Sequence, residues 1–517
     1  MILEAFFNSS IKRTKIFLFL VFVVACLLRY PGIKFDLEPF PYCDEDLFIH
    51  PAMNMVQNTN WNVPHFKSGG LNFLIPKLAG SIFTIISSEP LSTDVLRFIS
   101  RLIATVLLAS CAVFPLFGAI NIQTASKKPA VIGTLLYALS PLSTSASTWF
   151  YPDGFIAFFS AATIYLSEKI RNDYISQTTK RLPLLFCLLG LTLGAAISTK
   201  YNAIILCGYP FIVLLLNYKD IFSQKKLDTI KTLMKFISLA CLSLFLTFSV
   251  LNWGVFLNAN QFFQDLKINH YSLSENYYHG WSYYASLYFL FSLGLIPLIC
   301  LTTAKIDPKS FVYLFLKTLS IPILYLLIIG RYNLLYSRNI QIIFPFLVLF
   351  VSLCFEIQTN VHPKGKFRRF FFFSFTLFSS FLLFRTTNQF LQDLKQDSRL
   401  TARMMVKKQK WNEVYSNEGC GQARIIESTS SNPEYILLDN WFGGIDEKGQ
   451  LREPKQENIT AIFHARHFRD LHYLNHVGCW NWGLPFPFFE LQQKYTLETQ
   501  IKNGGPIVSV FRRKATQ

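Results

Sequence analysis

Apolar runs separated by short polar connections fill the first three quarters of the chain. Runs such as 16–28 and 236–250 contain no charged residue and are long enough to lie as helices in the hydrocarbon core of a membrane. The pattern predicts eleven membrane-spanning helices. They lie near residues 16–29, 97–121, 129–149, 154–167, 182–198, 201–217, 236–253, 284–303, 311–329, 340–356 and 370–386.

Two apolar stretches need a separate interpretation. The stretch 71–87 could cross a membrane by its hydrophobicity, but Pro, Lys and Gly interrupt it, so we predict an interfacial helix. Residues 183–216 form one apolar block broken only by Thr199 and Lys200, and we divide it there into two spans that meet at the outer surface. A single merged span would move the lysines of 219–235 to the outer side, against the positive-inside rule.

Basic residues are unevenly distributed between the two sets of connections. The set that begins with residues 1–15 holds 20 Lys and Arg in 77 positions, whereas the set that includes the long first loop, 30–96, holds 7 in 115 positions. The positive-inside rule therefore places the N-terminus in the cytoplasm. With eleven spans, the C-terminal tail lies outside, and the chain is predicted to be a multi-pass protein of the cell membrane.

The composition changes near the end of the last predicted span. Residues 391–517 are polar and carry short β-like runs at 435–438 and 507–511, between turns rich in Asn and Gly. We predict an all-α polytopic membrane protein with its transmembrane domain at 1–390, a long outer loop at 30–96 and a small exterior α/β domain at 391–517.

Composition narrows the class of protein further. Of 517 residues, 51% are hydrophobic, 52 are Phe and only 15% are charged, whereas a soluble protein carries about 25% charged residues. An ordinary soluble enzyme is excluded. The net charge of +18 comes from basic residues between apolar runs, which favours membrane anchoring over nucleic-acid binding. The ten cysteines form no CxxC pair and no Cys/His cluster, so we expect no metal–thiolate site.

Acidic residues gather on the predicted outer face. Asp44, Glu45 and Asp46 introduce an amphipathic stretch of the first loop. One of them could simply cap a helix, but three exceed what a cap needs. A carboxylate there can accept a proton from a hydroxyl or hold a divalent cation. Asp153 lies in a short outer Pro-Asp-Gly turn with no basic neighbour in sequence, and we expect it on the same face, although Pro-Asp-Gly is also an ordinary turn signal.

Basic and aromatic residues complete the outer surface. Lys200 and Tyr201 lie between two spans with almost no loop to solvate the ammonium group, so we predict that Lys200 binds an anion. Arg338 also lies at an outer span end without an acidic neighbour. Alternatively, such cations only reach for lipid headgroups. The further candidates for substrate binding are Lys67, His270 and His279.

Taken in order, these segments resemble the GT-C superfamily of integral-membrane glycosyltransferases, in the branch of protein O-mannosyltransferases and aminoarabinose transferases that use polyprenyl-phosphate sugars. The resemblance covers most of the chain. The order and sidedness of the motifs are more specific than any single motif. The motifs are residues 44–45, 97–102, 149–154, 190–201, 262–266 with His270 and His279, 338–345 and 393–399.

The resemblance implies transfer of a hexosyl or pentosyl group from a lipid-phosphate carrier to an acceptor on the outer face, with Asp44 as catalytic base. Lys, Arg or a metal can stabilise a phosphate leaving group, so one carboxylate suffices, and Glu45 and Asp153 are further catalytic candidates. The apolar spans would hold the polyprenyl chain. The acceptor is left as a protein, a lipid or a glycan. No cofactor is assigned, a divalent cation is left open, and nucleic acid is not expected as a partner.

Two other classes of protein compete with this interpretation. A secondary transporter, or a flippase for a lipid or lipid-linked sugar, could use eleven spans, but it would place polar groups within the membrane, often in inverted repeats. The clearest charge within a predicted span is Lys317, the acids lie outside, and the sequence contains no evident repeat. A purely structural subunit would leave the acid triplet unexplained. The sequence therefore favours the transferase.

Overall fold

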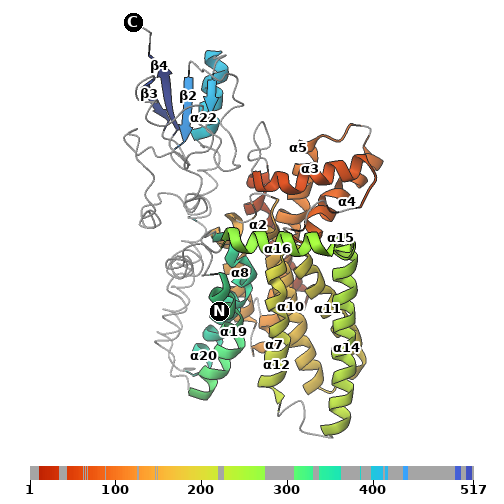
Figure 1. Cartoon of the computed structure of the whole chain (residues 1–517). Coiled ribbons are helices and arrows are strands. Elements are labelled where there is room, and N and C mark those ends of the chain that lie inside the picture. Colours follow the sequence, from red (N-terminus) through yellow and green to blue (C-terminus); the bar gives the residue numbers. More distant parts are fainter. Residues whose placement is uncertain are drawn as a thin grey trace.

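The protein is mostly helical in a computed structural model (Figure 1). The structure describes residues 11–33, 43–61, 63, 66, 68–87, 89–124, 127–145, 147, 150–218, 226–273, 308–329, 337–361, 385, 398–410, 414–416, 435–439, 495–501 and 508–514. Within these residues, five helices are long and apolar enough to span a membrane. The predicted spans 284–303 and 370–386 lie outside the described residues, so the count of eleven stays a prediction.

The long helices form one bundle with α10 (Pro152–Ile175) at its centre. Both the apolar and the small residues of α10 are buried, and the helix packs against at least four others. This is the expected behaviour of a helix that is apolar on all sides. The neighbours of α10 are α7 (Val113–Gln123), α11 (Leu182–Thr199), α12 (Gly208–Leu216) and α20 (Phe344–Val361), and the bundle also contains α2 (Ile11–Ile33), α8 (Lys128–Leu139), α14 (Lys226–Leu251) and α19 (Pro308–Ile329).

The predicted division of residues 183–216 is confirmed. Helix α11 ends at Thr199, Lys200 adopts an extended conformation with φ −148° and ψ 118°, and a 3₁₀-helix, η3 (Tyr201–Cys207), leads into α12. The extended residue allows the chain to turn back without a loop. Figure 1 places α11 and α12 within the same bundle, so the turn at Lys200 lies at one end of it.

One helix of the bundle changes its hydrogen-bonding pattern along its length. The segment Thr93–Gln123 is helical almost throughout, but between α5 (Thr93–Ser100) and α6 (Ala109–Cys111) it is a π-helix, η1 (Arg101–Leu108). π-Helical turns occur frequently at functional sites because they displace side chains from α-helical positions. Here the π-helix begins at a buried arginine.

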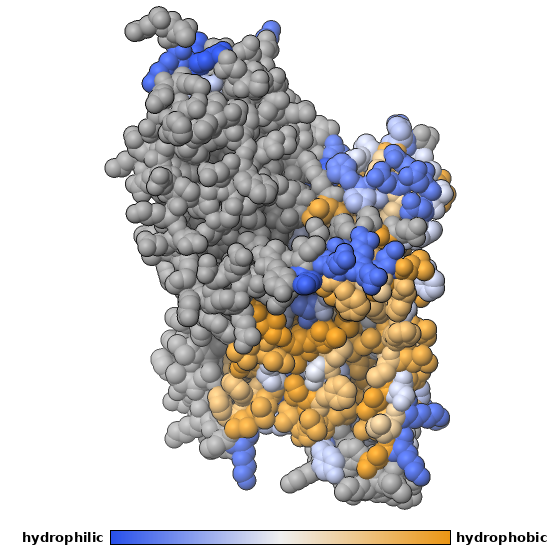
Figure 2. Space-filling view, in the orientation of Figure 1, coloured by the Kyte–Doolittle hydropathy of each residue, from blue (hydrophilic) through white to orange (hydrophobic). Residues whose placement is uncertain are grey.

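An apolar band lies across one face of the bundle. Figure 2 shows hydrophobic residues over the long helices, with hydrophilic residues gathered beyond both ends of the band. Exposed large side chains on α14 include Leu242, Phe245, Leu246 and Val250. Because water would not tolerate so continuous an apolar surface, these residues face lipid. The protein is a multi-pass integral membrane protein.

Three helices of the first loop lie together at one end of the bundle (Figure 1). They are α3 (Cys43–Gln57), α4 (Leu71–Ile86) and α5. Helix α4 buries Lys77, whose ammonium donates to the carbonyl of Met55 at 3.3 Å and lies 3.9 Å from the ring centroid of Trp61. Beyond α14, the short α15 (Trp253–Leu257) leads into α16 (Ala259–Leu273), which crosses the same end of the bundle.

The C-terminal part of the chain contributes a four-stranded sheet in the order β1-β2-β4-β3. Strands β1 (Val414–Ser416) and β2 (Tyr435–Asp439) are parallel, and the other two pairings are antiparallel, with β4 at Val508–Arg513 and β3 at Tyr495–Ile501. Helix α22 (Ser398–Gln409) precedes the sheet. Strands β2 and β4 coincide with the predicted runs to within two residues. The division of the chain into two domains stays a prediction.

Candidate functional site

The first turns of α3 and α10 bring the predicted acids to the same end of the bundle. The structure describes the side chains of Glu45, Asp153, Lys200 and Tyr201, and only the backbone of Asp44, His270 and Arg338. Lys67 and His279 lie outside the described residues. The site can therefore be built around the two described carboxylates.

Glu45 is completely buried and holds two cationic neighbours. Its carboxylate accepts hydrogen bonds from Arg101 Nε at 2.8 Å and Nη2 at 2.5 Å, and Arg97 Nε lies 3.7 Å away. The two arginines are four positions apart, so they share one face of the helix and both meet α3. Such a fork of guanidinium N–H groups on a carboxylate is among the strongest hydrogen-bonded pairs in proteins. Glu45 is thus fixed in place by its arginine partners.

The Glu45–Arg101 pair also joins segments that are distant in sequence. The backbone N–H of Phe150 donates to Glu45 Oε1 at 2.9 Å, three residues before Asp153. Arg101 Nη1 donates to the carbonyl of Ile33, at the C-terminal end of α2, at 2.9 Å. One buried ion pair therefore ties α2, α3, η1 and the start of α10 together.

Asp153 lies in the first turn of α10, where Pro152 occupies a favoured initial position. The carboxylate is 1% exposed, and its Oδ1 accepts from Lys200 Nζ at 2.6 Å. The sequence shows no basic residue near Asp153 and no acidic residue near Lys200, and the fold brings the two together. The two residues are 47 positions apart in sequence but the turn between α11 and η3 directs the lysine onto α10, where the buried carboxylate needs a counter-charge.

Lys200 has a second partner on a third element. Its ammonium donates to Asn339 Oδ1 at 3.0 Å, and Asn339 directly follows Arg338 in η5 (Ser337–Ile342). The backbone carbonyl of Asn339 accepts from Tyr325 Oη at 2.9 Å. The helices that carry Asp153, Lys200 and Arg338 are therefore held together by side-chain hydrogen bonds at this end of the bundle.

A glycine-containing part of the first loop packs directly on the turn at Lys200. Tyr201 Oη donates to the carbonyl of Ser68 at 3.1 Å, and Gly70 N–H donates to Asn252 Oδ1 at 2.8 Å. A Cβ at Gly69 would lie 2.0 Å from the carbonyl oxygen of Ser198. Only glycine allows this backbone approach.

An acid on α16 holds the same loop from the other side. Asp265 Oδ2 accepts from the backbone N–H of Phe66 at 2.8 Å, and the Phe66 and Tyr201 rings both pack edge-on against Phe262. Phe66 and Ser68, the neighbours of the predicted Lys67, are thus fixed between α16 and η3. The loop, the turn at Lys200 and α16 form one surface.

Sequence reasoning did not assign roles to several residues of this network. Arg97 and Arg101 appeared only within a motif, and Asn252, Asp265 and Asn339 were not nominated. The sequence did contain a sign of the ion pairs: Arg97 and Arg101 are spaced by four at the start of a predicted span, where a charge without a counter-charge is costly. Their partner could then be sought among the outer acids.

Within the described residues, no group of three His, Cys, Asp or Glu side chains could hold a metal ion. The side chain of Asp44 is not among them. The oxygens of Glu45 and Asp153 that face Arg101 and Lys200 are satisfied by these cations. Arg101 and Lys200 can neutralise and orient the two carboxylates, and the ammonium group of Lys200 can also donate a hydrogen bond to an anion.

The comparisons with known proteins identify the class of enzyme. Residues 59–272 match the family described as dolichyl-phosphate-mannose-protein mannosyltransferase, and the match contains Asp153, Lys200, Tyr201 and Asp265. No curated protein matches the chain. The family match agrees with the resemblance read from the sequence and indicates a glycosyltransferase that uses a lipid-linked sugar donor.

Several solved structures are similar to the chain. ArnT from Cupriavidus metallidurans bound to undecaprenyl phosphate is 11% identical, with coverage of 77% of this chain and 73% of that chain and a TM-score of 0.49. The S. cerevisiae protein O-mannosyltransferase Pmt1-Pmt2 complex bound to the sugar donor is 14% identical, with coverages of 50% and 35% and a TM-score of 0.37. An Archaeoglobus fulgidus oligosaccharyltransferase in complex with Zn and sulfate is 14% identical, with coverages of 75% and 55% and a TM-score of 0.46. Likenesses this distant carry no argument about individual residues.

Proposed function

We propose that this glycosyltransferase, whose residues 59–272 match the protein mannosyltransferase family, transfers a sugar from a polyprenyl-phosphate carrier to an acceptor on the outer face of the membrane, with Asp44 as the catalytic base. Asp44 takes the proton of the acceptor hydroxyl, whose oxygen bonds to the anomeric carbon of the sugar. The bond between that carbon and the phosphate oxygen breaks, and the polyprenyl phosphate leaves with the electron pair.

The distribution of ion pairs supports Asp44 in this role. A base needs a carboxylate that can accept a proton during the reaction. Glu45 binds two arginines in a fully buried pair, and Asp153 binds Lys200, so protonating either carboxylate would leave buried cations without compensation. Glu45 and Asp153 are therefore better suited to holding α3, α10 and Lys200 in position than to acting as the base. Asp44 is next to Glu45 in the first turn of α3, which the Glu45–Arg101 pair fixes beside α10.

Lys200 is the proposed contact for the donor phosphate. An ammonium group has three N–H donors, and Asp153 and Asn339 take two of them. The third can bond a phosphate oxygen as negative charge develops on the leaving group, since the side chain is 20% exposed. Arg338, Lys67, His270 and His279 are proposed to complete the donor and acceptor site, and Tyr201 to hold the first loop against it.

The substrates follow only as classes. The donor is a hexosyl or pentosyl phosphate lipid, and the acceptor is a hydroxyl of a protein, a lipid or a glycan. A divalent cation is left open, because a carboxylate such as that of Asp44 can hold one. Removal of divalent cations by a chelator, followed by addition of Mg²⁺ or Mn²⁺, tests whether transfer depends on one.

Substitution of Asp44 tests the proposal. Asp44→Asn keeps the shape of the side chain but cannot accept the proton, so transfer should fall by about 10²–10⁴-fold while the donor still binds. The assay offers a panel of polyprenyl-phosphate sugars to the purified full chain, with native membranes as the source of acceptors. Asp46→Asn, in the same acid triplet, is the matched control and should keep near-normal turnover. If folded Asp44→Asn protein turns over normally, Asp44 is not the base.

A further inference from the structure

A second polar site lies at the opposite end of the bundle, far from Asp153. Arg171 is eighteen residues after Asp153 on α10, which at 1.5 Å per residue separates the two by about 27 Å. There, a cavity of about 540 Å³ is lined by Gln123 from α7, Arg171 from α10, Lys309, Tyr313 and Lys317 from α19, and Glu356 from α20. Four helices of the bundle therefore meet at one cavity.

The charges around this cavity do not cancel. Glu168 is fully buried and neutralises one cation, since its carboxylate lies 3.1 Å from both Lys317 Nζ and Arg171 Nε and also accepts from Tyr209 Oη. Among the described residues, and with Lys309 and Glu356 counted, three cations face two anions, which leaves an excess of one positive charge. The first turn of a 22-residue helix, α19, adds the positive end of its dipole. These features favour an occupant with one net negative charge.

A polar side chain in the wall has no protein partner. Both polar atoms of the Gln123 amide are buried, and neither makes a hydrogen bond within the described part of the chain. Buried amides are almost always satisfied by a partner, so an unbonded one beside a cavity points to a bound molecule. The amide can donate to a phosphate oxygen or accept from a headgroup hydroxyl.

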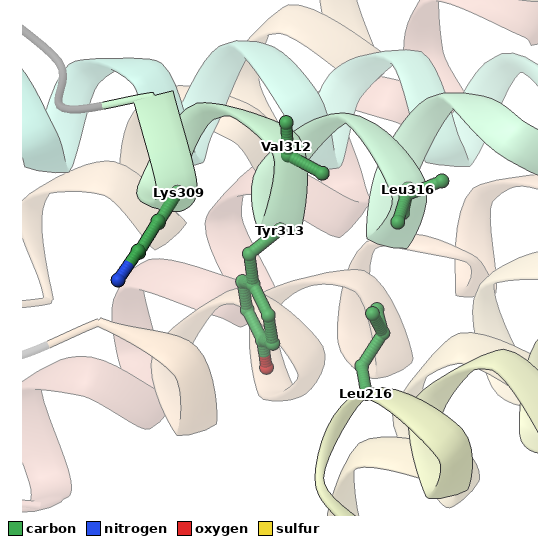
Figure 3. A pocket seen from close by; sticks show the side chains of 5 residues that line it. All are labelled: Leu216, Lys309, Val312, Tyr313 and Leu316. Carbon is green, nitrogen blue, oxygen red and sulfur yellow. The ribbon is translucent and has the colours of Figure 1, made fainter.

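An apolar groove continues from the polar cavity along the outside of α19. The groove has a volume of about 380 Å³ and is lined by Leu216 of α12 and by Val312 and Leu316 of α19, together with Lys309 and Tyr313, which also line the polar cavity. Figure 3 shows Lys309 at one end of this row, with Tyr313 directed toward the helix that carries Leu216. Val312 and Leu316 are 52% and 41% exposed, so the groove opens to lipid.

We propose that this compound site binds one molecule of an anionic glycerophospholipid. The phosphate lies in the polar cavity near Arg171 and Lys309, the headgroup bonds the Gln123 amide, and one acyl chain lies in the groove against Leu216 and Val312. A site that only contacted lipid chains would not need a net charge or a polar wall. The occupant is distinct from the sugar donor, whose phosphate would lie at the other end of α10.

Native mass spectrometry of the purified full chain tests the proposal. The protein is titrated with phosphatidylglycerol or with phosphatidylcholine of the same acyl chains. We expect one tightly bound phosphatidylglycerol, with about tenfold or greater preference over phosphatidylcholine, because the choline cation cancels the phosphate charge and would lie beside Arg171 and Lys309, whereas phosphatidylglycerol keeps its net negative charge. Equal binding of the two lipids would overturn the proposal.

Three variants distinguish the site from general attraction of anionic lipid. Lys309→Glu changes an exposed side chain, should leave folding intact, and should weaken phosphatidylglycerol binding by tenfold or more. Lys231→Glu makes the same charge change at an exposed position of α14 and should have little effect. Val312→Trp fills the groove and should weaken the binding of both lipids. An equal loss in the two lysine variants, or unchanged affinity in Val312→Trp, contradicts the site.

Discussion

Buried carboxylates at the ends of membrane helices stay ionised only where the fold supplies cations. In this protein Glu45 and Asp153 each have such a partner within 3 Å, Arg101 at the start of η1 and Lys200 at the turn between α11 and η3. The same side chains that determine charge at the site therefore also hold helices together. A substitution there changes both the free energy of unfolding and the geometry around Asp44.

Glu45→Gln, compared with Asp94→Asn, should show that the buried Glu45–Arg101 pair contributes more to stability than the partly exposed Asp94–Arg97 pair. The amide leaves Arg101 buried beside no full negative charge, so we expect the free energy of unfolding to fall by about 3–5 kcal/mol, with transfer lowered as α3 loses its position. Asp94→Asn is the control, because Asp94 pairs with Arg97 but is 36% exposed, and its loss should cost under about 1 kcal/mol. Chemical unfolding in detergent measures both. Similar losses in the two variants would mean that burial does not determine the strength of these pairs.

The Asp153–Lys200 pair is suited to a double-mutant cycle. Asp153→Asn and Lys200→Met should each lower the free energy of unfolding by about 1–3 kcal/mol, a range reduced because Lys200 is partly exposed to solvent. The double variant should lose less than the sum, with a coupling energy of about 0.5–3 kcal/mol. Donor affinity measured on the same variants tests the phosphate contact. Strict additivity of the two losses would show that the pair is not coupled.

The sequence was sufficient to nominate the individual residues but not their partners. Three neighbouring acids, an acid in a short outer turn and a lysine between two spans are local signals, and they correctly selected Glu45, Asp153 and Lys200 as residues of one end of the bundle. The pairs join positions separated by 56, 47 and 139 residues. Such pairings depend on how helices pack, which local charge and hydropathy do not specify. The sequence predicted an anionic partner for Lys200, and only the packing of the helices shows that Asp153 is one of its partners.

At the scale of elements, the first loop is held by backbone contacts against the ends of two spans. Asn72 Nδ2 donates to the carbonyls of Gly69 at 2.9 Å and Thr199 at 2.8 Å, and Asn252 bonds both Gly70 and Ser198. The loop therefore packs closely against α11 and α14 at Gly69 and Gly70, and the side-chain amides of Asn72 and Asn252 bond it to both helices. This close packing fixes the distance between the loop and Lys200.

Gly69→Ala tests the close approach. The new Cβ would lie 2.0 Å from the Ser198 carbonyl oxygen, so one of the two backbone segments must move. We therefore expect the free energy of unfolding to fall by an amount near the upper end of about 1–3 kcal/mol, and sugar transfer to be reduced. Gly208→Ala is the matched control, because its Cβ would meet only the terminal methyl of Ile321 at 3.0 Å and a helical alanine is favoured by about 0.5–1 kcal/mol. Thermal unfolding compares the two. A Gly69→Ala protein as stable as wild type would mean that the loop relaxes freely.

The positions of the helices were better predicted than their ends, since α10 continues to Ile175 beyond the predicted 154–167 and α14 begins at Lys226 before the predicted 236–253. A polar pair within a long apolar block located the end of α11, and apolar length located α10, α14 and α19. The π-helix within Thr93–Gln123 was not predicted, because its residues Arg101–Leu108 have the same apolar composition as an α-helix and differ only in which carbonyl each N–H reaches.

At the scale of the whole molecule, the two polar ends of the bundle should face different compartments. The excess of Lys and Arg in one set of connections predicts that the turn after α10 is cytoplasmic and that the turn before α5 is outside. Ser176 and Glu89 are exposed residues of these two turns. Their accessibility from each side of the membrane reports the orientation of the entire bundle.

Single cysteines at these positions measure that orientation. In a background without native cysteines, Glu89→Cys should react with a membrane-impermeant maleimide on intact cells, and Ser176→Cys only after the membrane is opened. Labelling of both variants after opening controls for folding. The reverse pattern would place the acids in the cytoplasm and remove the proposed outer-face reaction, although it would leave the ion pairs unchanged.

The π-helix at Arg101–Leu108 affects where the sequence of this chain can lose a residue without disturbing the fold. In a π-helix each N–H bonds the carbonyl five positions earlier instead of four. The segment therefore contains an extra residue compared with an α-helix that spans the same distance. Losing one residue at an exposed position such as Ile103 can restore α-helical pairing while the flanking turns keep their faces. The same deletion in α14 would rotate everything beyond it by about 100°. The helix that carries Arg97 and Arg101 is thus the part of the bundle best able to absorb a deletion during evolution, and relatives one residue shorter there would retain the same outer face.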